Sequence, residues 1–209
     1  KDSLSLKRPY QFLEMIRLMI PLLLFAHIGH TQSHDNLPFE SIGDYPEAYT
    51  AETVLIRLIS GLGYRYYWAT KDLSERDINY RPSPEASSCS ETLEHIYSLT
   101  QTIKNVIFDI PNVRPQEDSN MNHIQLRKAT LNTLHLAVEH LKTLDKGAIQ
   151  KKSVLFSKAG KINTFPLWHL INGPISDALY HVGQVVSFRR TTGNPIHPKV
   201  NVFTGKNRD

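Results

Sequence analysis

The sequence has one cysteine, little net charge and no internal repeat. A single cysteine, Cys89, excludes an intrachain disulfide and a cysteine-rich zinc site, so any bound metal would need histidine and carboxylate ligands. The net charge is +4 over 209 residues, and residues 1–33 carry +2 of it. A body with so little positive charge and no stripe of Lys or Arg gives no reason to expect nucleic-acid binding.

The amino-terminal residues have the pattern of a secretory leader. Basic residues precede the apolar run LMIPLLLFAHIG, and small polar residues follow it. The run is shorter than the ~20 residues of a membrane span. We therefore predict a signal peptide or leader over residues 1–33, cleaved after Ser33, no membrane span once it is removed, and export to the periplasm or out of the cell. The alternative is a buried or amphipathic helix of a cytoplasmic protein, which Glu14 and Pro21 favour.

Residues 34–209 carry the pattern of one all-α domain. Apolar residues at three-to-four spacing, with capping and stop signals, predict helices over residues 46–73, 88–108, 120–144 and 166–193. Ala159-Gly160 lies between two short β-prone runs, which predict a hairpin or extended loop between the third and fourth helices. Gly173-Pro174 predicts a kink in the last helix. We expect an all-α four-helix bundle followed by an extended tail.

The predicted last helix places an acid and a histidine on one face. Asp177 and His181 are four residues apart, so both side chains lean towards the same point beside the helix and could hold a divalent ion together. Gln184 falls in the same sector. Such pairs are common on solvated helix faces, so the pair alone favours an ordinary surface.

The predicted second helix supplies a further histidine. His95 lies on or beside the apolar stripe that contains Leu93, Ile96 and Ile103. An unpaired buried imidazole costs about 1–3 kcal/mol, so His95 needs a partner or a ligand. Two interpretations stay open: a core histidine hydrogen-bonded to a backbone carbonyl or to Asp177, and a metal ligand.

Two segments, SCSETLEHIYSLTQTI and DALYHVGQVVSFRRTTGNP, resemble the DinB-like superfamily of helical-bundle proteins proposed to be metalloenzymes. The family has a histidine in its second helix and an H-x-x-x-H pair in its last, followed by Gly-Gln and Arg-x-x-Gly. His95 and His181 match the first histidine and the second histidine of the pair, and Gly183-Gln184 follows in the family's order. The resemblance covers residues 51–195 and implies a DinB-like bundle over residues 34–209.

The chain departs from the family pattern at one ligand. Asp177 stands where the family has the first histidine of the pair. Since carboxylate is a legitimate zinc ligand, the resemblance implies a divalent-metal site of His95, Asp177 and His181, with zinc or nickel expected. The added negative charge would weaken the ion's Lewis acidity and raise the pKa of its bound water. The same substitution leaves open a degenerate site without metal.

The resemblance implies a metal-dependent transferase that uses a small thiol substrate. The alternatives are a metal-dependent hydrolase and a non-catalytic, stress-related binding or scaffold bundle, and a homodimer is the expected assembly. Export would count against the transferase, because small thiols are chiefly cytosolic.

Several other residues are expected to have secondary or structural roles. His169 and Trp168 are expected in the second shell or on a pocket wall, and Gln184 is expected to orient a ligand or bound water. The aromatic residues of the first helix favour the core. Arg189-Arg190 fits a solvated helix end, although an anionic ligand would also suit it. Cys89 is expected to be structural.

Overall fold

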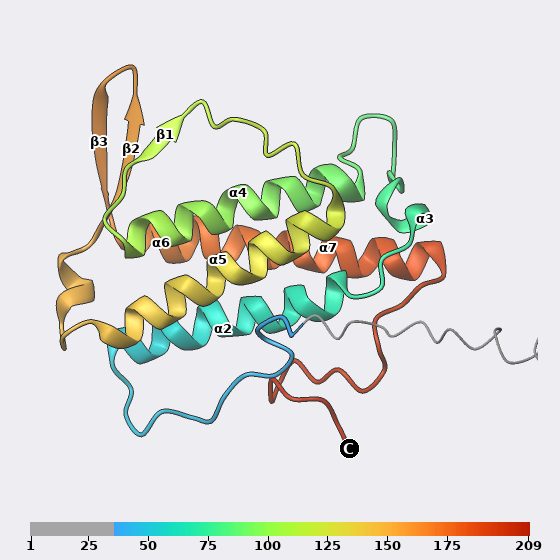
Figure 1. Ribbon diagram of the computed structural model, residues 1–209, viewed down its shortest axis with the longest axis horizontal. Coiled ribbons are helices and arrows are strands. Elements are labelled where there is room, and N and C mark those ends of the chain that lie inside the picture. The colour runs from blue at the N-terminus through green and yellow to red at the C-terminus, as the bar shows by residue number, and fades with distance from the viewer. Residues whose placement is uncertain (1–35) are drawn as a thin grey trace, which may run out of the picture. The chain divides into compact units, whose positions relative to one another are not determined.

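The computed structural model describes residues 36–209, which form helices and a small sheet (Figure 1). The predicted leader, residues 1–33, lies outside the described residues. Within the described part, no helix combines the length and the apolar character needed to cross a membrane. The elements in chain order are α2 (Ala51–Thr70), α3 (Glu75–Ile78), α4 (Cys89–Ile107), β1 (Asn112–Arg114), α5 (His123–Thr143), a 3-10 turn (Ala148–Lys151), β2 (Ser153–Lys158), β3 (Lys161–Pro166), α6 (Trp168–Leu170), a π-helix (Ile171–Ile175) and α7 (Ser176–Thr192).

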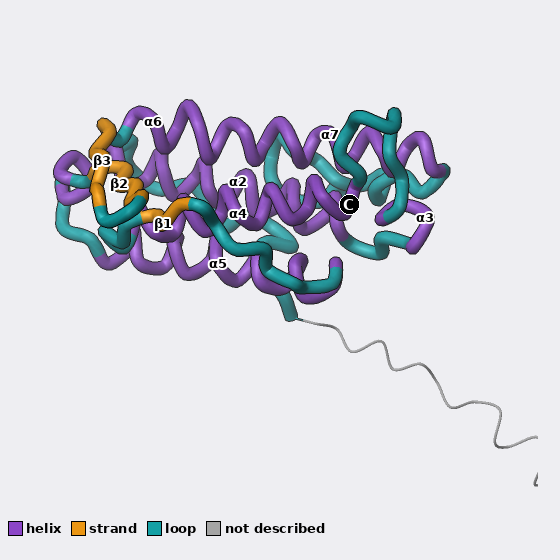
Figure 2. Tube along the Cα trace, turned by 90° about the horizontal axis from the view of Figure 1, so that it is seen from above, coloured by secondary structure: helices purple, strands orange, loops and turns teal. Residues whose placement is uncertain are grey.

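Helices α2, α4, α5 and α7 are the long helices and lie side by side (Figures 1 and 2). Their buried side chains form an apolar core. Helices α2 and α4 each pack against both α5 and α7. The largest fully buried side chains include Leu62, Leu93 and Leu131, one from each of three helices. Tyr64 and Tyr66 are also fully buried, so the prediction that the aromatic residues of α2 belong to the core is confirmed.

The helix boundaries follow capping signals in the sequence. A capping box begins α4: the Ser88 N–H donates to Glu91 Oε2 at 2.7 Å, and the Glu91 N–H donates to Ser88 Oγ at 3.2 Å. Capping boxes also begin α2 and α5, at Thr50 and Asn122. Helix α7 ends at Gly193, whose φ of 86° is the left-handed conformation that glycine adopts without steric cost.

The predicted all-α fold class is wrong, because the chain also contains a three-stranded mixed sheet. Strand β2 pairs antiparallel with β3 and parallel with β1. The hairpin predicted around Ala159-Gly160 is present, with positive φ at both turn residues, as a two-residue hairpin turn requires. The sequence did not indicate β1, which adds a third strand to the hairpin and so completes a sheet.

Strand β1 escaped prediction because it is three residues long and lies between two prolines. Pro111 and Pro115 mark a break in the chain, and three residues carry no alternating apolar pattern. Its partner strand lies about 40 residues further along the chain. Asn112 fixes the pairing: its buried side chain donates to the Leu155 carbonyl at 3.0 Å and accepts from Asn105 Nδ2 at 3.1 Å.

At Gly173-Pro174, where the sequence predicts a kink, a π-helix interrupts the regular α-helix between α6 and α7. Pro174 has no N–H to donate, so a regular α-helical hydrogen bond is lost at this point. The Ser176 hydroxyl donates to the Ile171 carbonyl at 2.7 Å and supports the wider turn. Helix α6 has no side-chain cap, because β3 runs up to Pro166 directly before it.

Arg189 is buried, whereas the sequence predicted a solvated helix end. Its side chain is 3% exposed, and Nη1 donates to the carbonyls of Trp68, Ala69 and Lys71 at 2.8–3.2 Å. These carbonyls belong to the carboxyl end of α2, where helical carbonyls lack partners and a positive charge is favoured. Arg189 also donates to both the backbone and the side-chain oxygen of Asn194. It therefore fastens α7 to α2.

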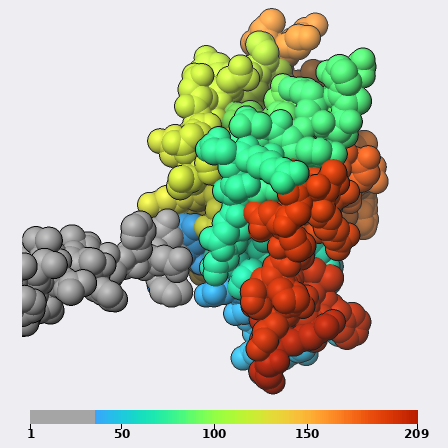
Figure 3. All heavy atoms as spheres, turned by 90° about the vertical axis from the view of Figure 1, so that its right-hand side faces the viewer, coloured from blue at the N-terminus to red at the C-terminus, as the bar shows by residue number. Residues whose placement is uncertain are grey.

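The predicted tail packs back onto α2, and Figure 3 shows it in red beside the turquoise residues that follow α2. The Tyr64 hydroxyl donates to Asn207 Oδ1 at 3.0 Å and accepts from the Asn201 N–H at 3.1 Å. Gly205 has a φ of 72°, and a Cβ there would lie 2.4 Å from the Ile42 side chain, so only glycine fits. Residues 194–209 contain no helix or strand but are held by these contacts.

Asp77 is a fully buried carboxylate beside this network. It accepts from the Ser74 N–H and hydroxyl at 2.8 and 2.7 Å, from Asn194 Nδ2 at 2.7 Å, and from the Thr192 hydroxyl. Burial alone raises the pKa of Asp77, but the hydrogen bonds from Ser74, Thr192 and Asn194 outweigh it and bring the pKa to about 2. The charged form is therefore the one that the fold stabilises.

We predict that Asp77→Asn lowers the free energy of unfolding at neutral pH by about 2–3 kcal/mol, since buried donors lose a charged acceptor. The pKa of Asp77 is depressed from its ordinary 3.8, so its stabilisation is complete above pH 3.8 and is lost as the pH falls through about 2. The difference between wild type and variant should shrink over that window. Urea denaturation at several pH values measures it.

Asp145→Asn is the matched control, because Asp145 is exposed. It should change the unfolding free energy by less than about 0.5 kcal/mol. An Asp77→Asn variant as stable as this control would contradict the role given to Asp77.

Candidate metal centre

His95, Asp177 and His181 converge between α4 and α7, which pack against each other. Asp177 Oδ2 lies 3.3 Å from His95 Nε2, and Asp177 Oδ1 lies 3.3 Å from His181 Nε2. One ligand atom from each residue can be chosen so that all three lie within 4.8 Å of one another. The carboxylate therefore stands between two imidazoles, with one oxygen facing each.

The group lies at the surface of the helices, not in the core. The side chains of His95, Asp177 and His181 are 47%, 42% and 20% exposed. His95 is therefore not a core residue, since it lies at the edge of the stripe whose members Leu93 and Ile96 are buried. The Asp177 partner that the core interpretation named is present, within hydrogen-bond distance of His95 Nε2. The His95 and His181 rings meet edge to face, with centroids 4.6 Å apart.

Gln184 fixes the orientation of His181. His181 Nδ1 lies 2.7 Å from Gln184 Oε1. An amide oxygen only accepts, so Nδ1 carries the proton and the Nε2 lone pair of a neutral ring faces the Asp177 carboxylate. Two acceptors 3.3 Å apart repel each other unless a proton or a cation lies between them. This arrangement is the usual one for a metal-bound histidine whose other nitrogen is held by a hydrogen bond.

The donor set fits a divalent transition metal. Ligands about 2.0–2.2 Å from a tetrahedral zinc ion lie about 3.4 Å from one another. Each imidazole nitrogen lies at that distance from one oxygen of Asp177, although the two oxygens are different atoms. With one atom taken from each residue the three lie within 4.8 Å of one another, so the side chains would draw slightly closer around a single ion. Two imidazole nitrogens and one carboxylate are three protein ligands, and the exposed side leaves a fourth position open.

The other two residues expected near the site lie elsewhere. His169 is exposed and its ring packs beside Phe165, with centroids 5.7 Å apart. Trp168 lines a separate pocket beside α2. Neither belongs to the group of potential ligands found among the described residues. The kink before α7 therefore does not add His169 to the ligand set.

Comparison with known proteins supports the fold. No family model matches the chain, and no curated protein matches it in sequence. The crystal structure of a DinB-like protein, YjoA from Bacillus subtilis, is similar with a TM-score of 0.53 and 14% sequence identity. The match covers 73% of this chain and 99% of that one. The chain has the DinB-like fold.

The match to a DinB-like structure agrees with the resemblance seen in the sequence. That resemblance was visible in the segments around His95 and His181, and the structural match extends over most of the chain. At 14% identity the match concerns the fold alone, so the chemistry of the centre has to be argued from its own residues.

Cys89 is the remaining group with potential chemistry, and its surroundings make it inert. It is fully buried at the first position of α4. Burial, with a smaller contribution from the nearby Asp77 carboxylate, raises the pKa of the Cys89 thiol to about 12. Because the thiolate is the reactive form, Cys89 cannot serve as a nucleophile in the folded protein.

We predict that Cys89 reacts with a thiol-specific disulfide reagent at least about 100-fold more slowly in the folded protein than after unfolding in guanidinium chloride. Absorbance of the released chromophore follows the reaction. Equal rates in the folded and unfolded states would show that Cys89 is accessible.

Proposed function

We propose that the chain binds a divalent transition metal, zinc or nickel, through His95 Nε2, Asp177 and His181 Nε2. The observation that carries the proposal is the placement of the Asp177 carboxylate 3.3 Å from both imidazoles, with His181 Nδ1 already committed to Gln184. A cation at this point neutralises the carboxylate and accepts both nitrogen lone pairs.

The exposure of the centre supports a reactive role over a structural one. Structural zinc sites are closed by four protein ligands, whereas catalytic sites keep a position open for water or substrate. His95 and Asp177 are each more than 40% exposed, so an external ligand can reach the same point. This accessibility argues against a scaffold bundle whose metal only holds helices together.

For the reaction, we propose transfer of a small thiol to an electrophile, as the DinB-like resemblance implies. A bound ion would supply Lewis acidity that favours the thiolate form of the substrate. His95 and His181 are neutral donors, while Asp177 adds a negative charge and makes the ion less electrophilic than three histidines would. Gln184 keeps His181 in the tautomer that can bind. Hydrolysis is the alternative, with water in place of the thiol.

The metal content of the purified protein tests the proposed centre. Wild-type protein dialysed against zinc or nickel should retain about one ion per chain. Outer-shell partners of metal ligands are worth 10–100-fold in affinity, so Gln184→Leu should weaken binding by about that factor and His181→Ala by at least about 100-fold. Elemental analysis and a competition titration with a chromogenic chelator measure both effects.

His135→Ala is the matched control, because His135 is exposed on α5 and lies outside the group. It should bind metal like the wild type. A wild-type protein that retains no metal at neutral pH would refute the proposed centre, and loss of metal in the control variant would refute its location.

The proposed thiol transfer is tested by an activity assay. Metal-loaded protein should accelerate conjugation of a small thiol with a chromogenic aromatic halide, and removal of the ion by a chelator should abolish the acceleration. Asp177→His removes the extra negative charge, so it should keep the metal and raise the rate by about tenfold. Conjugation is followed by product absorbance, and ester hydrolysis is assayed in parallel. Hydrolysis without conjugation would favour the hydrolase, and a loaded protein inactive in both assays would favour the binding bundle.

A further inference from the structure

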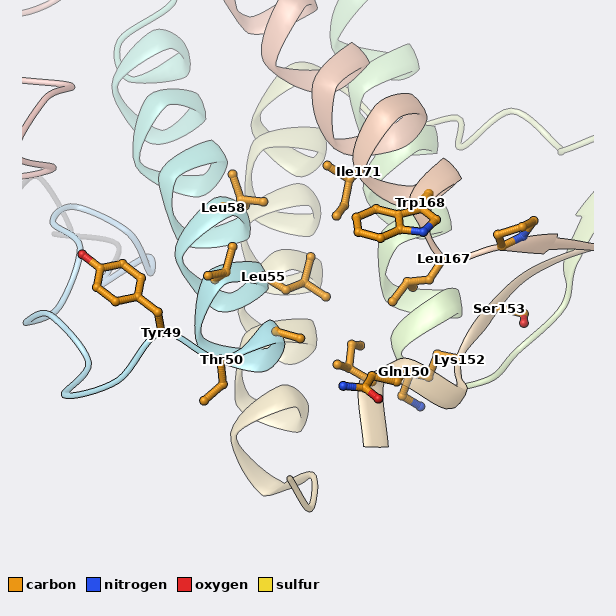
Figure 4. A pocket seen from close by; sticks show the side chains of 14 residues that line it. Tyr49, Thr50, Leu55, Leu58, Gln150, Lys152, Ser153, Leu167, Trp168 and Ile171 are labelled. Atoms are coloured by element: carbon orange, nitrogen blue, oxygen red, sulfur yellow. The ribbon is translucent and has the colours of Figure 1, made fainter. Parts of the chain in front are cut away.

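A pocket of about 590 Å³ lies between the first turns of α2 and the segment that includes α6 (Figure 4). Its walls come from three parts of the chain that are distant in sequence: the start of α2, the 3-10 turn before β2, and α6 with the beginning of the π-helix. The volume is within the range of small-molecule sites, which hold ligands of drug-like size in cavities of roughly 300–1,000 Å³.

The walls of this pocket are mainly apolar. Leu55 and Leu58 project from α2, and Figure 4 shows Leu167 and Ile171 across the gap from them. Gln150 and Ser153 add polar side chains on one side, and Tyr49 and Thr50 add theirs at the start of α2. Apolar walls with a few polar groups are the usual composition of a small-molecule site.

Among the described residues that line the pocket, none has a charged group available to pair with a ligand. Lys152 is on its wall, but its side chain is 6% exposed and its Nζ is paired with Asp109 Oδ2 at 2.6 Å. Glu52, in the first turn of α2, accepts a hydrogen bond from the Gly147 N–H at 2.8 Å. An ionised ligand would therefore lose its hydration without gaining an ion pair, so a neutral ligand is favoured.

Trp168 gives the pocket an exposed aromatic wall. Its side chain is 77% exposed, although it is one of the two largest apolar side chains in the chain. In Figure 4 the indole lies on the α6 side of the pocket next to Leu167 and Ile171. An exposed ring at the edge of an apolar cavity can stack on a planar group of a ligand. The contact removes from water the apolar surface that the ring exposes when the ligand is absent.

We propose that this pocket binds a neutral, mainly apolar small molecule that carries a planar ring. The ring stacks on Trp168 and the remaining apolar part contacts Leu55, Leu58 and Ile171. A small polar substituent reaches Gln150 or Ser153.

This site is separate from the candidate metal centre. None of the residues that line it is His95, Asp177 or His181. The proposal therefore does not depend on metal binding, and the two can fail independently.

The experiment uses N-phenyl-1-naphthylamine, a neutral probe with a phenyl and a naphthyl group whose fluorescence rises in apolar surroundings. Titration of the full chain should give saturable binding of about one probe per chain. Val54 lines the pocket and is 44% exposed, so Val54→Arg introduces a charge there without disturbing the core. Val54→Arg and Trp168→Ala should each weaken binding by about tenfold or more, through lost apolar and ring contacts.

Matched controls make the same changes elsewhere. Leu136→Arg alters an exposed leucine of α5, and Phe203→Ala removes an exposed aromatic ring from the tail. Both should change the dissociation constant by less than about twofold, as surface substitutions away from a site usually do. His181→Ala should also bind the probe normally, which separates this site from the metal centre. Thermal unfolding by circular dichroism verifies that each variant is folded.

Three outcomes would overturn the proposal. The first is no saturable binding by the wild type, and the second is equal binding by wild type, Val54→Arg and Trp168→Ala. The third is that the wild type sediments as a dimer and Trp168→Ala sediments as a monomer. A second copy of the chain would then be the occupant of the pocket. Saturable binding by a monomer, weakened only by the two pocket variants, supports it.

Discussion

The buried guanidinium of Arg189 joins the two helices on which the remaining structure depends. It donates to three carbonyls at the carboxyl end of α2, and it lies on α7, the helix that also carries Asp177 and His181. Through Asn194 the same group reaches the buried carboxylate of Asp77. The Arg189 guanidinium and the Asp77 carboxylate are both removed from water, and both are hydrogen-bonded. Together they hold α2, α3 and α7 in one arrangement.

The candidate centre depends on how α7 is presented to α4. Helix α7 is fastened at its carboxyl end by Arg189 and begins directly after the π-helix that surrounds Pro174. The turn geometry there sets the rotation of α7 about its axis, and so the direction in which Asp177 and His181 point. His95 meets them from α4, and Gln184 on α7 holds the His181 ring.

The sequence predicted what depends on local pattern, and missed what depends on distant partners. The capping box at Ser88 and the break at Pro174 are local signals, and the structure contains both. Strand β1 has no signal of its own, because pairing with β2 creates it. The burial of Arg189 depends on carbonyls about 120 residues away, and a helix-end arginine is ordinarily solvated. His95 lies beside the apolar stripe, one of the two positions that the sequence allowed, and its choice of partner depends on α7, about 80 residues away.

The buried thiol of Cys89 has a consequence for where this fold can persist. The described residues contain no other cysteine, so no sulfur chemistry contributes to their stability, and the one thiol is shielded from oxidants and from other thiols. The stability of the fold therefore does not depend on whether its compartment is oxidising or reducing. Its resistance to unfolding should be the same under oxidising and reducing conditions, because it derives wholly from noncovalent contacts.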